Sequence, residues 1–407
     1  MRFRLPSFCR LVGAARKKAN KFAFSLATHR QFRLFFYLCI MILDELALTF
    51  IPELGVRGVA HLIDLYGSAE VVYAQPEYKL ILCAELRSDI ATRIVQKIGY
   101  PEAERELRYC EENGINITSC VDDNYPHLLR EIPDRPHIVY SVGDIGALSS
   151  RHILSVVGTR RISSYGESVC AQLIPELAEM FPDLVVVSGL AFGVDAAAHR
   201  AALAAGVRTV AVMANKLPDV IPAQHRNLAK DIVEHGGAII TELTSQTKQN
   251  GAYYIPRNRI VAGVADGLLV VESPTNGGSL STAKAADAYS RSIMALPGRI
   301  TDSRSEGTNH LIKTNVAQLV TSARDIADVL GWEVESAMPE KMHYAPREVN
   351  EKEQLVLAVL ADNSDGLTMD NIADKTQLHI SELSAILLNM ELSGLVRQLP
   401  GRRYVIC

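Results

Sequence analysis

Six short runs of Val, Ile and Leu without polar alternation recur through the middle of the chain, over residues 153–157, 184–187, 209–213, 238–241, 268–271 and 293–296. Continuous apolar runs of this length are typical of strands that are buried on both faces of a parallel sheet. Segments with helical spacing separate these runs. Residues 117–332 are therefore predicted to form an α/β domain with a doubly wound, extended Rossmann-like sheet.

The region before this sheet shows a different pattern. Apolar residues recur at helical spacing between Leu46 and Tyr109, with breaks at Pro and Gly, which predicts a bundle of short helices over residues 41–116. The Ile51-Pro-Glu-Leu-Gly55 turn resembles the turn of a helix-hairpin-helix or SAM-type domain. A carboxylate at Glu53 would repel phosphate, so we interpret this turn as structural.

The last segment, residues 351–407, predicts three helices followed by a hairpin, which is the pattern of a winged-helix domain. Its expected recognition helix, residues 380–393, carries Glu382 and Glu391 and neither Lys nor Arg. A helix that reads the major groove needs donors for base edges and cations for phosphates. We therefore expect this domain to contact a protein, or a nucleic-acid backbone weakly through the arginines of its wing, Arg397, Arg402 and Arg403.

Two stretches lack the periodicity of a packed core. Residues 333–350 are charged and contain two prolines, which predicts a linker. Residues 1–40 carry nine Lys or Arg and no Asp or Glu, and the apolar run at 32–43 is too short to span a membrane. We interpret residues 1–40 as an extension upstream of a start at Met41, or as a basic arm that binds nucleic acid or a membrane surface.

Charge restricts how the body of the protein can hold a polyanion. Removing the nine positive charges of the extension from the net charge of −4 leaves −13 on residues 41–407. Such a body repels phosphate, so a nucleic-acid partner must be held by a local basic patch.

Several functional classes are disfavoured by missing motifs. The seven cysteines are scattered without metal-ligand spacing, so we expect no metal site and reduced thiols in a cytoplasmic protein. The sequence holds no G-x-x-x-x-G-K-[ST] loop for a nucleoside triphosphate, and no G-x-G-x-x-G with an acidic residue at the ribose distance. We expect no cofactor.

Three small-residue turns stand where an apolar run ends and a helix begins, at residues 158–160, 188–193 and 276–282. Glycine lets a backbone approach an anion, and the free N–H groups of the following helix attract it. Arg160 adds a planar cationic fork. The candidate anion-binding residues of these turns are Gly158, Thr159, Arg160, Ser188, Gly189, Gly277, Gly278, Ser279, Ser281 and Thr282.

Further candidates lie beside these turns. Arg257, Asn258 and Arg259 precede a buried strand. Residues 295–298 and 307–312 are predicted to form further loops at strand ends, and Lys313 follows the second of them as a possible cation. Asp195 is expected to cap a helix that starts at Ala196, and we expect His199, on the next turn, to be packed rather than catalytic.

Taken together, several motifs resemble those of the DprA/Smf DNA-processing family in order and spacing. They are Asn124-Tyr-Pro-His-Leu128, Tyr140-Ser-Val-Gly143, Val156-Val-Gly-Thr-Arg160, Val187-Ser-Gly-Leu-Ala-Phe-Gly-Val-Asp195 with Ala198-His199, Pro256-Arg-Asn-Arg-Ile260, Gly277-Gly-Ser-Leu-Ser-Thr-Ala283, Leu296-Pro-Gly298 and Gly307-Thr-Asn-His-Leu-Ile312. The resemblance covers residues 46–330 and, more loosely, the winged-helix segment.

This resemblance implies a non-enzymatic, single-stranded DNA-binding protein. It would protect incoming DNA during natural transformation and load the RecA recombinase against single-strand-binding protein, as a homodimer formed through its Rossmann-like domain. Carried over by position, the Arg160 turn, the Ser188-Gly189 turn and the Gly277–Thr282 loop would line the pocket that grips a DNA phosphate.

The sequence departs from the family pattern at the rim of this pocket. Met213-Ala-Asn-Lys-Leu-Pro218 replaces a glycine-rich segment, Ile221-Pro222 replaces a Tyr-Pro, and Gly277 replaces a common serine. These changes remove no cation, so they bear on the fine affinity rather than on the binding mode.

Two other classes of function stay open. LOG-type nucleotide phosphoribohydrolases use a similar sheet and a G-G-x-G-T-x-x-E loop, and residues 278–282 would align with that loop. Ala285 would then occupy the place of the catalytic glutamate, and Glu272 is an imperfect substitute for it. A protein-interaction adaptor is the third class, and it predicts that Arg160 is dispensable.

Overall fold

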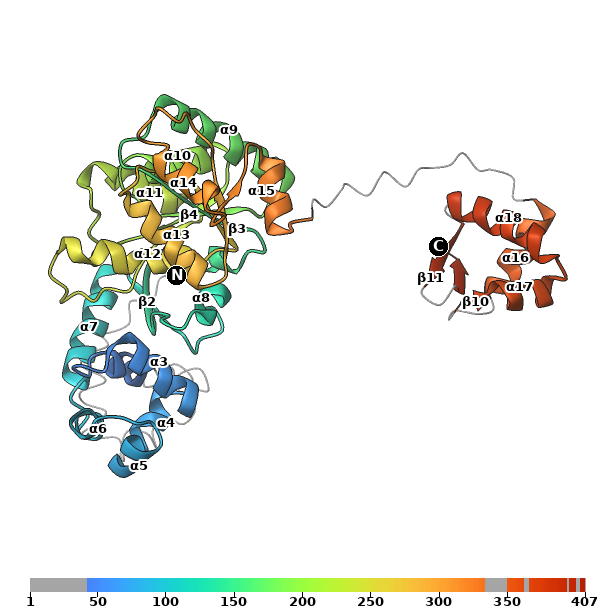
Figure 1. Ribbon diagram of the computed structural model, residues 1–407. Helices are drawn as coiled ribbons and strands as arrows, with labels where there is room; N and C mark the ends of the chain where they lie inside the picture. Colours follow the sequence, from blue (N-terminus) through green and yellow to red (C-terminus); the bar gives the residue numbers. More distant parts are fainter. Residues whose placement is uncertain (1–41, 334–349, 362–365, 394, 400–402, 407) are drawn as a thin grey trace, which may run out of the picture. The chain divides into compact units, whose positions relative to one another are not determined.

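The computed structural model describes residues 42–333, 350–361, 366–393, 395–399 and 403–406. The chain divides into two compact units, residues 1–334 and 335–407 (Figure 1). The expected basic extension at 1–40, and all but the ends of the expected linker at 333–350, lie outside the described residues.

A nine-stranded sheet forms the centre of the larger unit, with the strand order β1-β2-β6-β5-β4-β3-β7-β8-β9. The strands are β1 (Asn116–Ser119), β2 (Ile138–Gly143), β3 (Ile153–Val157), β4 (Val185–Ser188), β5 (Arg208–Val212), β6 (Ala238–Thr241), β7 (Gly267–Val270), β8 (Ser292–Ala295) and β9 (Gln318–Leu319). Strands β3 to β9 pair in parallel, whereas β1 and β2 form an antiparallel edge. All six predicted strands are confirmed to within one residue at each end.

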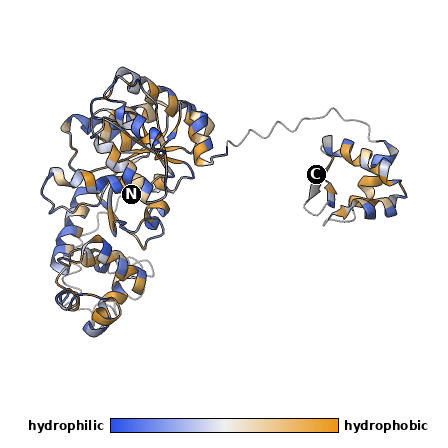
Figure 2. Ribbon diagram, in the orientation of Figure 1, coloured by the Kyte–Doolittle hydropathy of each residue, from blue (hydrophilic) through white to orange (hydrophobic). Residues whose placement is uncertain are grey.

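Helices cover both faces of this sheet, which makes the fold doubly wound as predicted (Figure 1). One face packs against α9 (Ser164–Met180), α10 (Val194–Ala204), α11 (Arg226–Glu234) and α15 (Ala323–Leu330), and the other against α8 (His127–Glu131), α12 (Tyr254–Gly263), α13 (Gly278–Ala288) and α14 (Glu306–Lys313). In β3, Leu154 and Val156 pack toward α9 and α10, while Ile153 and Val157 pack toward α12 and α13. Burial on both faces explains the continuous apolar runs, which Figure 2 shows as orange strands at the centre of the unit.

The strand order reverses beside β3. From β3 the chain adds β4, β5 and β6 on one side, and it then returns to add β7, β8 and β9 on the other side. The helices that follow β3 and β7 leave toward opposite faces of the sheet. Crevices at such a reversal, outside the carboxyl ends of the strands, are where doubly wound folds bind ligands.

A small helical domain precedes the sheet within the same unit. It contains a helical segment over 42–49, followed by α3 (Gly55–Tyr66), α4 (Ala69–Tyr73), α5 (Glu77–Leu82), α6 (Ser88–Val95) and α7 (Tyr100–Asn113). In the turn before α3, Glu53 has a φ of 66° and its carboxylate lies 3.0 Å from Arg87 and 3.3 Å from Arg93. These ion pairs fasten the turn to α6, in agreement with its structural interpretation.

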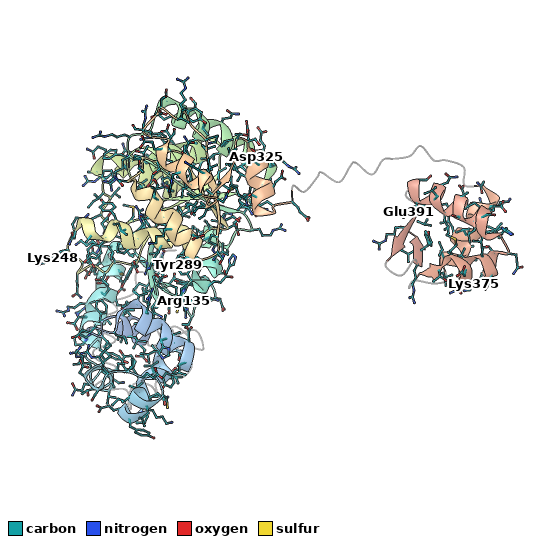
Figure 3. The ribbon with its side chains drawn as sticks, viewed as in Figure 1. Arg135, Lys248, Tyr289, Asp325, Lys375 and Glu391 are labelled. Atoms are coloured by element: carbon teal, nitrogen blue, oxygen red, sulfur yellow. The ribbon has the colours of Figure 1, made fainter. Side chains whose placement is uncertain are left out.

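The smaller unit is a winged-helix domain. Its elements are α16 (Glu351–Ala361), β10 (Leu367–Thr368), α17 (Met369–Thr376), α18 (Ile380–Leu392), β11 (Val396–Leu399) and β12 (Arg403–Ile406). The three strands form an antiparallel sheet in the order β10-β12-β11. Val356, Leu383 and Met390 are buried in its core, while Glu391 of α18 and Lys375 of α17 are exposed (Figure 3).

Within the residues that the structure describes, we find no helix with both the length and the apolar character needed to cross a membrane.

Two polar contacts join the helical domain to the antiparallel edge of the sheet. His137, just before β2, is buried with Nε2 2.6 Å from Glu45 Oε2 and Nδ1 3.1 Å from Cys120 Sγ. The other carboxylate oxygen of Glu45 accepts the Ala69 N–H at 2.9 Å. Nearby, Arg135 (Figure 3) forms an ion pair with Asp64 of α3.

Burial alone lowers the pKa of His137, but the contacts with Cys120 and Glu45 outweigh burial and raise this pKa to about 9. A neutral imidazole facing a buried carboxylate would leave that carboxylate without a counter-charge. The folded protein therefore holds His137 as a cation over the neutral pH range.

We predict that the His137–Glu45 pair stabilises the protein below pH 6.5 and that this contribution is lost as the pH rises toward about 9. The sign follows because a folded-state pKa above the unfolded value of about 6.5 favours the folded state only while the group is protonated. The loss should be on the order of 3 kcal/mol in the free energy of unfolding. Urea denaturation between these pH values measures it, and Glu45→Gln should flatten the dependence. Equal slopes in both proteins would contradict the assignment.

Candidate functional site

A cleft of about 240 Å³ lies over the carboxyl ends of β3, β4 and β7, where the strand order reverses. The first turns of α12 and α13 complete its walls. Ten of the fourteen predicted anion-binding residues line it, and they are Gly158, Thr159, Arg160, Gly189, Arg257, Asn258, Gly277, Gly278, Ser279 and Thr282.

The turn after β3 is held from two sides. The Thr159 N–H donates to the Glu272 carbonyl at 2.7 Å, and the Val194 N–H donates to the Thr159 carbonyl at 3.1 Å. Gly158 has no room for a side chain, because a Cβ there would lie 2.4 Å from Val194 Cγ2 and 2.8 Å from the Glu272 carbonyl oxygen. This fixed turn presents Arg160 as an exposed side chain at the mouth of the cleft.

Arg160 lies over an aromatic ring. Its guanidinium carbon is 4.9 Å from the ring centroid of Tyr254, the first residue of α12. A cation over an aromatic face is attracted by the ring quadrupole, and the contact restricts the rotamers of the arginine. The cleft mouth therefore offers a preorganised cation beside an aromatic surface.

The turn after β4 depends on Asp195, for which the prediction of a helix cap is wrong. Helix α10 begins at Val194 with Gly193 as its N-cap, so Asp195 lies inside the first turn. Its buried carboxyl accepts the Ala191 N–H at 3.3 Å and braces the preceding turn. Burial raises the pKa of Asp195, against the opposing effect of Arg257.

His199 is packed, as expected. It is fully buried in α10 and its Nδ1 lies 2.7 Å from Thr209 Oγ1. Burial lowers the pKa of His199 to about 3, so the ring is neutral at every physiological pH. A neutral, enclosed imidazole supplies no charge to the cleft.

Arg257 lies beneath the floor of the cleft. Its side chain is buried, and its guanidinium donates a short hydrogen bond to the Val212 carbonyl at the end of β5. Gly189 makes room for this group, because a Cβ there would lie 2.1 Å from Arg257 Nη1. Burial lowers the pKa of Arg257, while the charge of Asp195 opposes that effect. Among the described residues its Nε finds no hydrogen-bond partner.

The start of α13 forms the opposite wall. Gly277 is its N-cap and Gly278 its first residue, so no side chain satisfies the first N–H groups of this fully described helix. Asn258 bridges the two walls, because its Nδ2 donates to Ser281 Oγ at 2.9 Å and to the Gly278 carbonyl at 3.3 Å. Gly278 and Ser279, whose N–H groups receive no side-chain cap, therefore line the cleft at the positive end of the helix dipole.

Four predicted site residues lie outside the lining of the cleft. Ser188 is buried and donates to the Val156 carbonyl at 2.6 Å. Arg259 binds both carboxylate oxygens of Glu242, at 2.8 and 2.7 Å, and is a structural ion-pair residue rather than a free cation. Ser281 Oγ donates to the Gly278 carbonyl at 2.6 Å and accepts from Asn258, and Lys313 is exposed at the C-terminal end of α14.

The prediction of a loop over residues 307–312 is also wrong, because those residues lie within α14. The buried Gly307, the second residue of this helix, donates its N–H to the Ser273 carbonyl at 2.8 Å and so supports the loop after β7. It therefore braces the cleft from outside instead of lining it.

Sequence reasoning counted Tyr254 among the aromatic residues near the loops, but it missed Val261 and did not recognise the α12 wall as one helix face. Tyr254 and Val261 line the cleft together with Arg257 and Asn258. Their spacing of i, i+3, i+4 and i+7 is that of one helix face, which could have identified them once residues 254–263 were recognised as helical.

Glu272, the substitute carboxylate considered for a hydrolase, is already engaged. It is buried, accepts the Ser163 N–H at 2.9 Å and takes a short hydrogen bond from Ser163 Oγ. Ser163 is the N-cap of α9, so Glu272 fastens that helix to the end of β7. It does not line the cleft.

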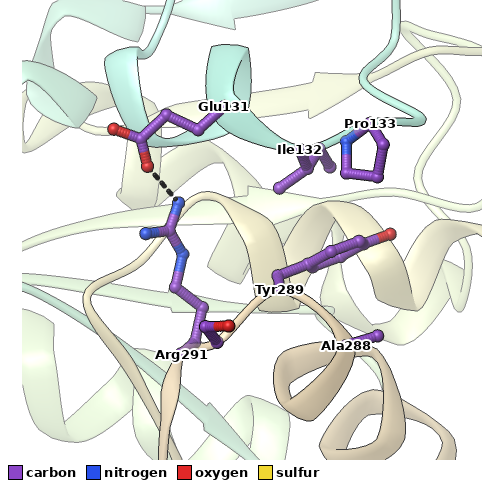
Figure 4. Close-up of a pocket in the computed structure, with 7 residues that line it drawn as sticks. Glu131, Ile132, Pro133, Ala288, Tyr289 and Arg291 are labelled. Carbon is purple, nitrogen blue, oxygen red and sulfur yellow. Dashed lines mark hydrogen bonds and ion pairs between the residues drawn. The ribbon is translucent and has the colours of Figure 1, made fainter.

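A second hollow lies at the far end of α13, between Glu131–Pro133 and Ala288–Arg291 (Figure 4). Arg291 donates to the Leu128 carbonyl at 2.8 Å and pairs with Glu131 at 3.0 Å. The ring of Tyr289 faces Ile132 and Pro133 in the close-up. These contacts fasten α8 to α13, so this hollow is a structural junction.

The DNA recombination-mediator protein A family matches residues 116–331, more than half of the chain. The chain belongs to this family. The DprA winged helix domain matches residues 340–402. Protein Smf of Escherichia coli (strain K12) is 33% identical over 312 residues, which cover 75% of this chain and 81% of that protein.

Two further family members support this placement. DNA processing protein DprA of Bacillus subtilis (strain 168) is 33% identical over 231 residues, covering 57% of this chain and 76% of the relative. The X-ray structure of DNA processing protein A from Streptococcus pneumoniae shares 31% identity with a TM-score of 0.53, and the match covers 67% of this chain and 94% of that one.

We predict that Gly158→Ala destabilises the protein by about 1–3 kcal/mol, because the new methyl group overpacks a site closed by a backbone carbonyl. Gly278→Ala is the matched control, since it lines the same cleft and has nothing within 4 Å of its Cβ position. Urea denaturation compares the two. Similar unfolding free energies would show that the β3 turn is not rigidly held.

Proposed function

We propose that the cleft binds the phosphate backbone of single-stranded DNA, and that the chain protects this strand and delivers it to the RecA recombinase during natural transformation. The observation that carries the proposal is Arg160 lying over Tyr254 at the mouth of a cleft that is walled by the uncapped first turn of α13. Membership of a family described as recombination mediators supports the same function.

The cleft has the chemistry of a phosphate site. The first turn of α13 contains no acidic residue, so nothing in that turn competes with an incoming anion. Arg160 adds charge at the mouth and Arg257 adds charge beneath the floor. Because the body of the protein is acidic, such a local arrangement is what a polyanion would require.

The apolar rim favours a single strand over a duplex. Tyr254 and Ile255 line the cleft, and Ile255 is 69% exposed. Phe192, in the turn after β4, is 44% exposed. Unpaired bases can stack on such side chains, whereas the bases of a duplex are already stacked on one another.

The partners follow from family membership and from the winged-helix domain. The family is described as recombination mediators and includes members named as DNA processing proteins, which favours RecA as the protein that receives the strand. We propose that single-strand-binding protein competes for the same strand and that a homodimer is the active form. Helix α18 carries neither Lys nor Arg, so we assign the winged helix to protein contact rather than to reading base sequence. We propose no catalytic activity, because Glu272 is bonded to Ser163 instead of facing the cleft.

We predict that residues 41–407 bind a short single-stranded oligonucleotide more tightly than the corresponding duplex, and that Arg160→Ala weakens this binding about tenfold or more. The variant should also reduce the slope of log K against log salt by about 0.7, as expected for one lost phosphate contact on a single strand. Fluorescence anisotropy at several salt concentrations measures both quantities.

Arg324→Ala is the control for this experiment, since Arg324 is exposed on α15 and pairs with Asp328 at 2.9 Å. It should bind as the unaltered protein does. A folded protein that fails to bind the single strand would refute the proposal. Release of free base from nucleoside monophosphates would instead support a LOG-like enzyme, and unchanged binding by Arg160→Ala would move the contact elsewhere.

A further inference from the structure

The loop after β8 lies at the same edge of the sheet as the cleft. Strands β3, β7 and β8 are parallel neighbours, so residues 296–305 leave the sheet two strands away from the turn that carries Arg160. Neighbouring strands are about 4.8 Å apart, which places the two strand ends roughly 10 Å from each other.

This loop is fastened on both sides. Asn309 of α14 accepts the Gly298 N–H at 3.2 Å and donates to the Gly298 carbonyl at 3.0 Å. On the other side, the Tyr165 hydroxyl of α9 donates to the Pro297 carbonyl at 3.2 Å. A binding surface that is already ordered loses less conformational entropy when a ligand attaches.

The loop exposes an alternation of cations and apolar groups. Arg299 is exposed, Ile300 is 93% exposed, and the Arg304 side chain is 42% exposed. Tyr165 presents a ring that is 47% exposed beside them. We call Tyr165, Arg299, Ile300 and Arg304 the β8 surface.

An isoleucine that is almost fully exposed contributes nothing to the packing of the loop. Arginines that alternate with apolar and aromatic side chains are the chemistry of single-strand grooves, in which cations follow the phosphates and flat surfaces receive bases. Asp302 offsets part of the charge, because Arg304 Nε lies 3.2 Å from its carboxylate. Arg299 also interacts electrostatically with Asp302, and its side chain is exposed. Arg160 and Arg161 extend the positive region toward the cleft.

We infer that a single DNA strand held in the cleft continues across the β8 surface, where Arg299 and Arg304 contact successive phosphates and where Tyr165 and Ile300 support bases. This inference rests on the proposed function of the cleft. The surface adjoins the cleft along one sheet edge, so a flexible strand can follow both, whereas a rigid duplex cannot bend into the cleft and still reach the loop.

The test compares oligothymidylates of about four and about sixteen nucleotides, which bracket the site sizes of small single-strand-binding folds. The double variant Arg299→Ala/Arg304→Ala should bind the short oligonucleotide as the unaltered protein does. It should bind the long one about tenfold more weakly near physiological salt, with a salt slope reduced by about 1.4 for two lost phosphate contacts. Arg324→Ala, which removes another exposed arginine paired with an aspartate, should change neither value.

A second variant increases the net positive charge of the β8 surface instead of decreasing it. Asp302→Asn keeps an acceptor for the Arg304 N–H but removes the carboxylate that offsets the arginine. It should tighten binding of the long oligonucleotide by about two- to fivefold, the equivalent of one exposed ion pair.

The outcomes separate this inference from the proposed function. If the unaltered protein binds the long strand and Arg160→Ala weakens that binding, the cleft proposal stands. If the Arg299→Ala/Arg304→Ala variant then binds both lengths normally, the β8 surface is not part of the path. Loss of short-oligonucleotide binding in the double variant would also overturn the inference, because it would show that these arginines act on the cleft itself.

Discussion

The guanidinium of Arg257 holds the cleft together from below. It bonds the end of β5 through the Val212 carbonyl, lies against Gly189 in the turn after β4, and faces the carboxyl of Asp195 in α10. A buried charge needs such partners, because removing it from water is costly unless polar groups surround it. These constraints place the first turn of α12, and with it Tyr254, at a fixed position relative to the strand ends.

Three adjacent residues of α12 point to three different parts of the molecule. Arg257 lies under the cleft, Asn258 reaches across to Ser281 of α13, and Arg259 turns away to Glu242. Successive residues of a helix are about 100° apart, so a short polar motif can supply a floor, a bridge and an outer ion pair at once. The cation left free at the mouth is Arg160, which stands on a turn rather than on a helix.

The central strands could be predicted because burial on both faces leaves few polar positions in them and no polar alternation, and the turns after β3, β4 and β7 followed from their glycines. The short edge strand β9 has only two residues, both exposed, so no apolar run marked it. The start of α10 was predicted two residues too late, because Gly193, with a φ of 78°, serves as the cap in place of Asp195.

The arginines of α12 show more clearly what could not be predicted from the sequence. The sequence placed these residues ahead of a buried strand without assigning them to a helix, whose first turn tolerates Pro256. Without the helix, Arg257 and Arg259 were equivalent candidates. Only the α-helical spacing from Tyr254 separates the arginine that faces the cleft from the one that binds Glu242, and no local sequence feature revealed Glu242 as its partner.

The single carboxylate of Glu45 touches two distant segments, the start of α4 through the Ala69 N–H and the residue before β2 through His137. Opening the His137 contact would leave the buried Glu45 without its counter-charge, and opening the Ala69 contact would remove a hydrogen bond from the same carboxylate, so the two segments cannot open separately at low cost. The helical domain and the antiparallel edge of the sheet should therefore behave as one cooperative unit, whose amide hydrogens exchange with solvent through a shared opening event.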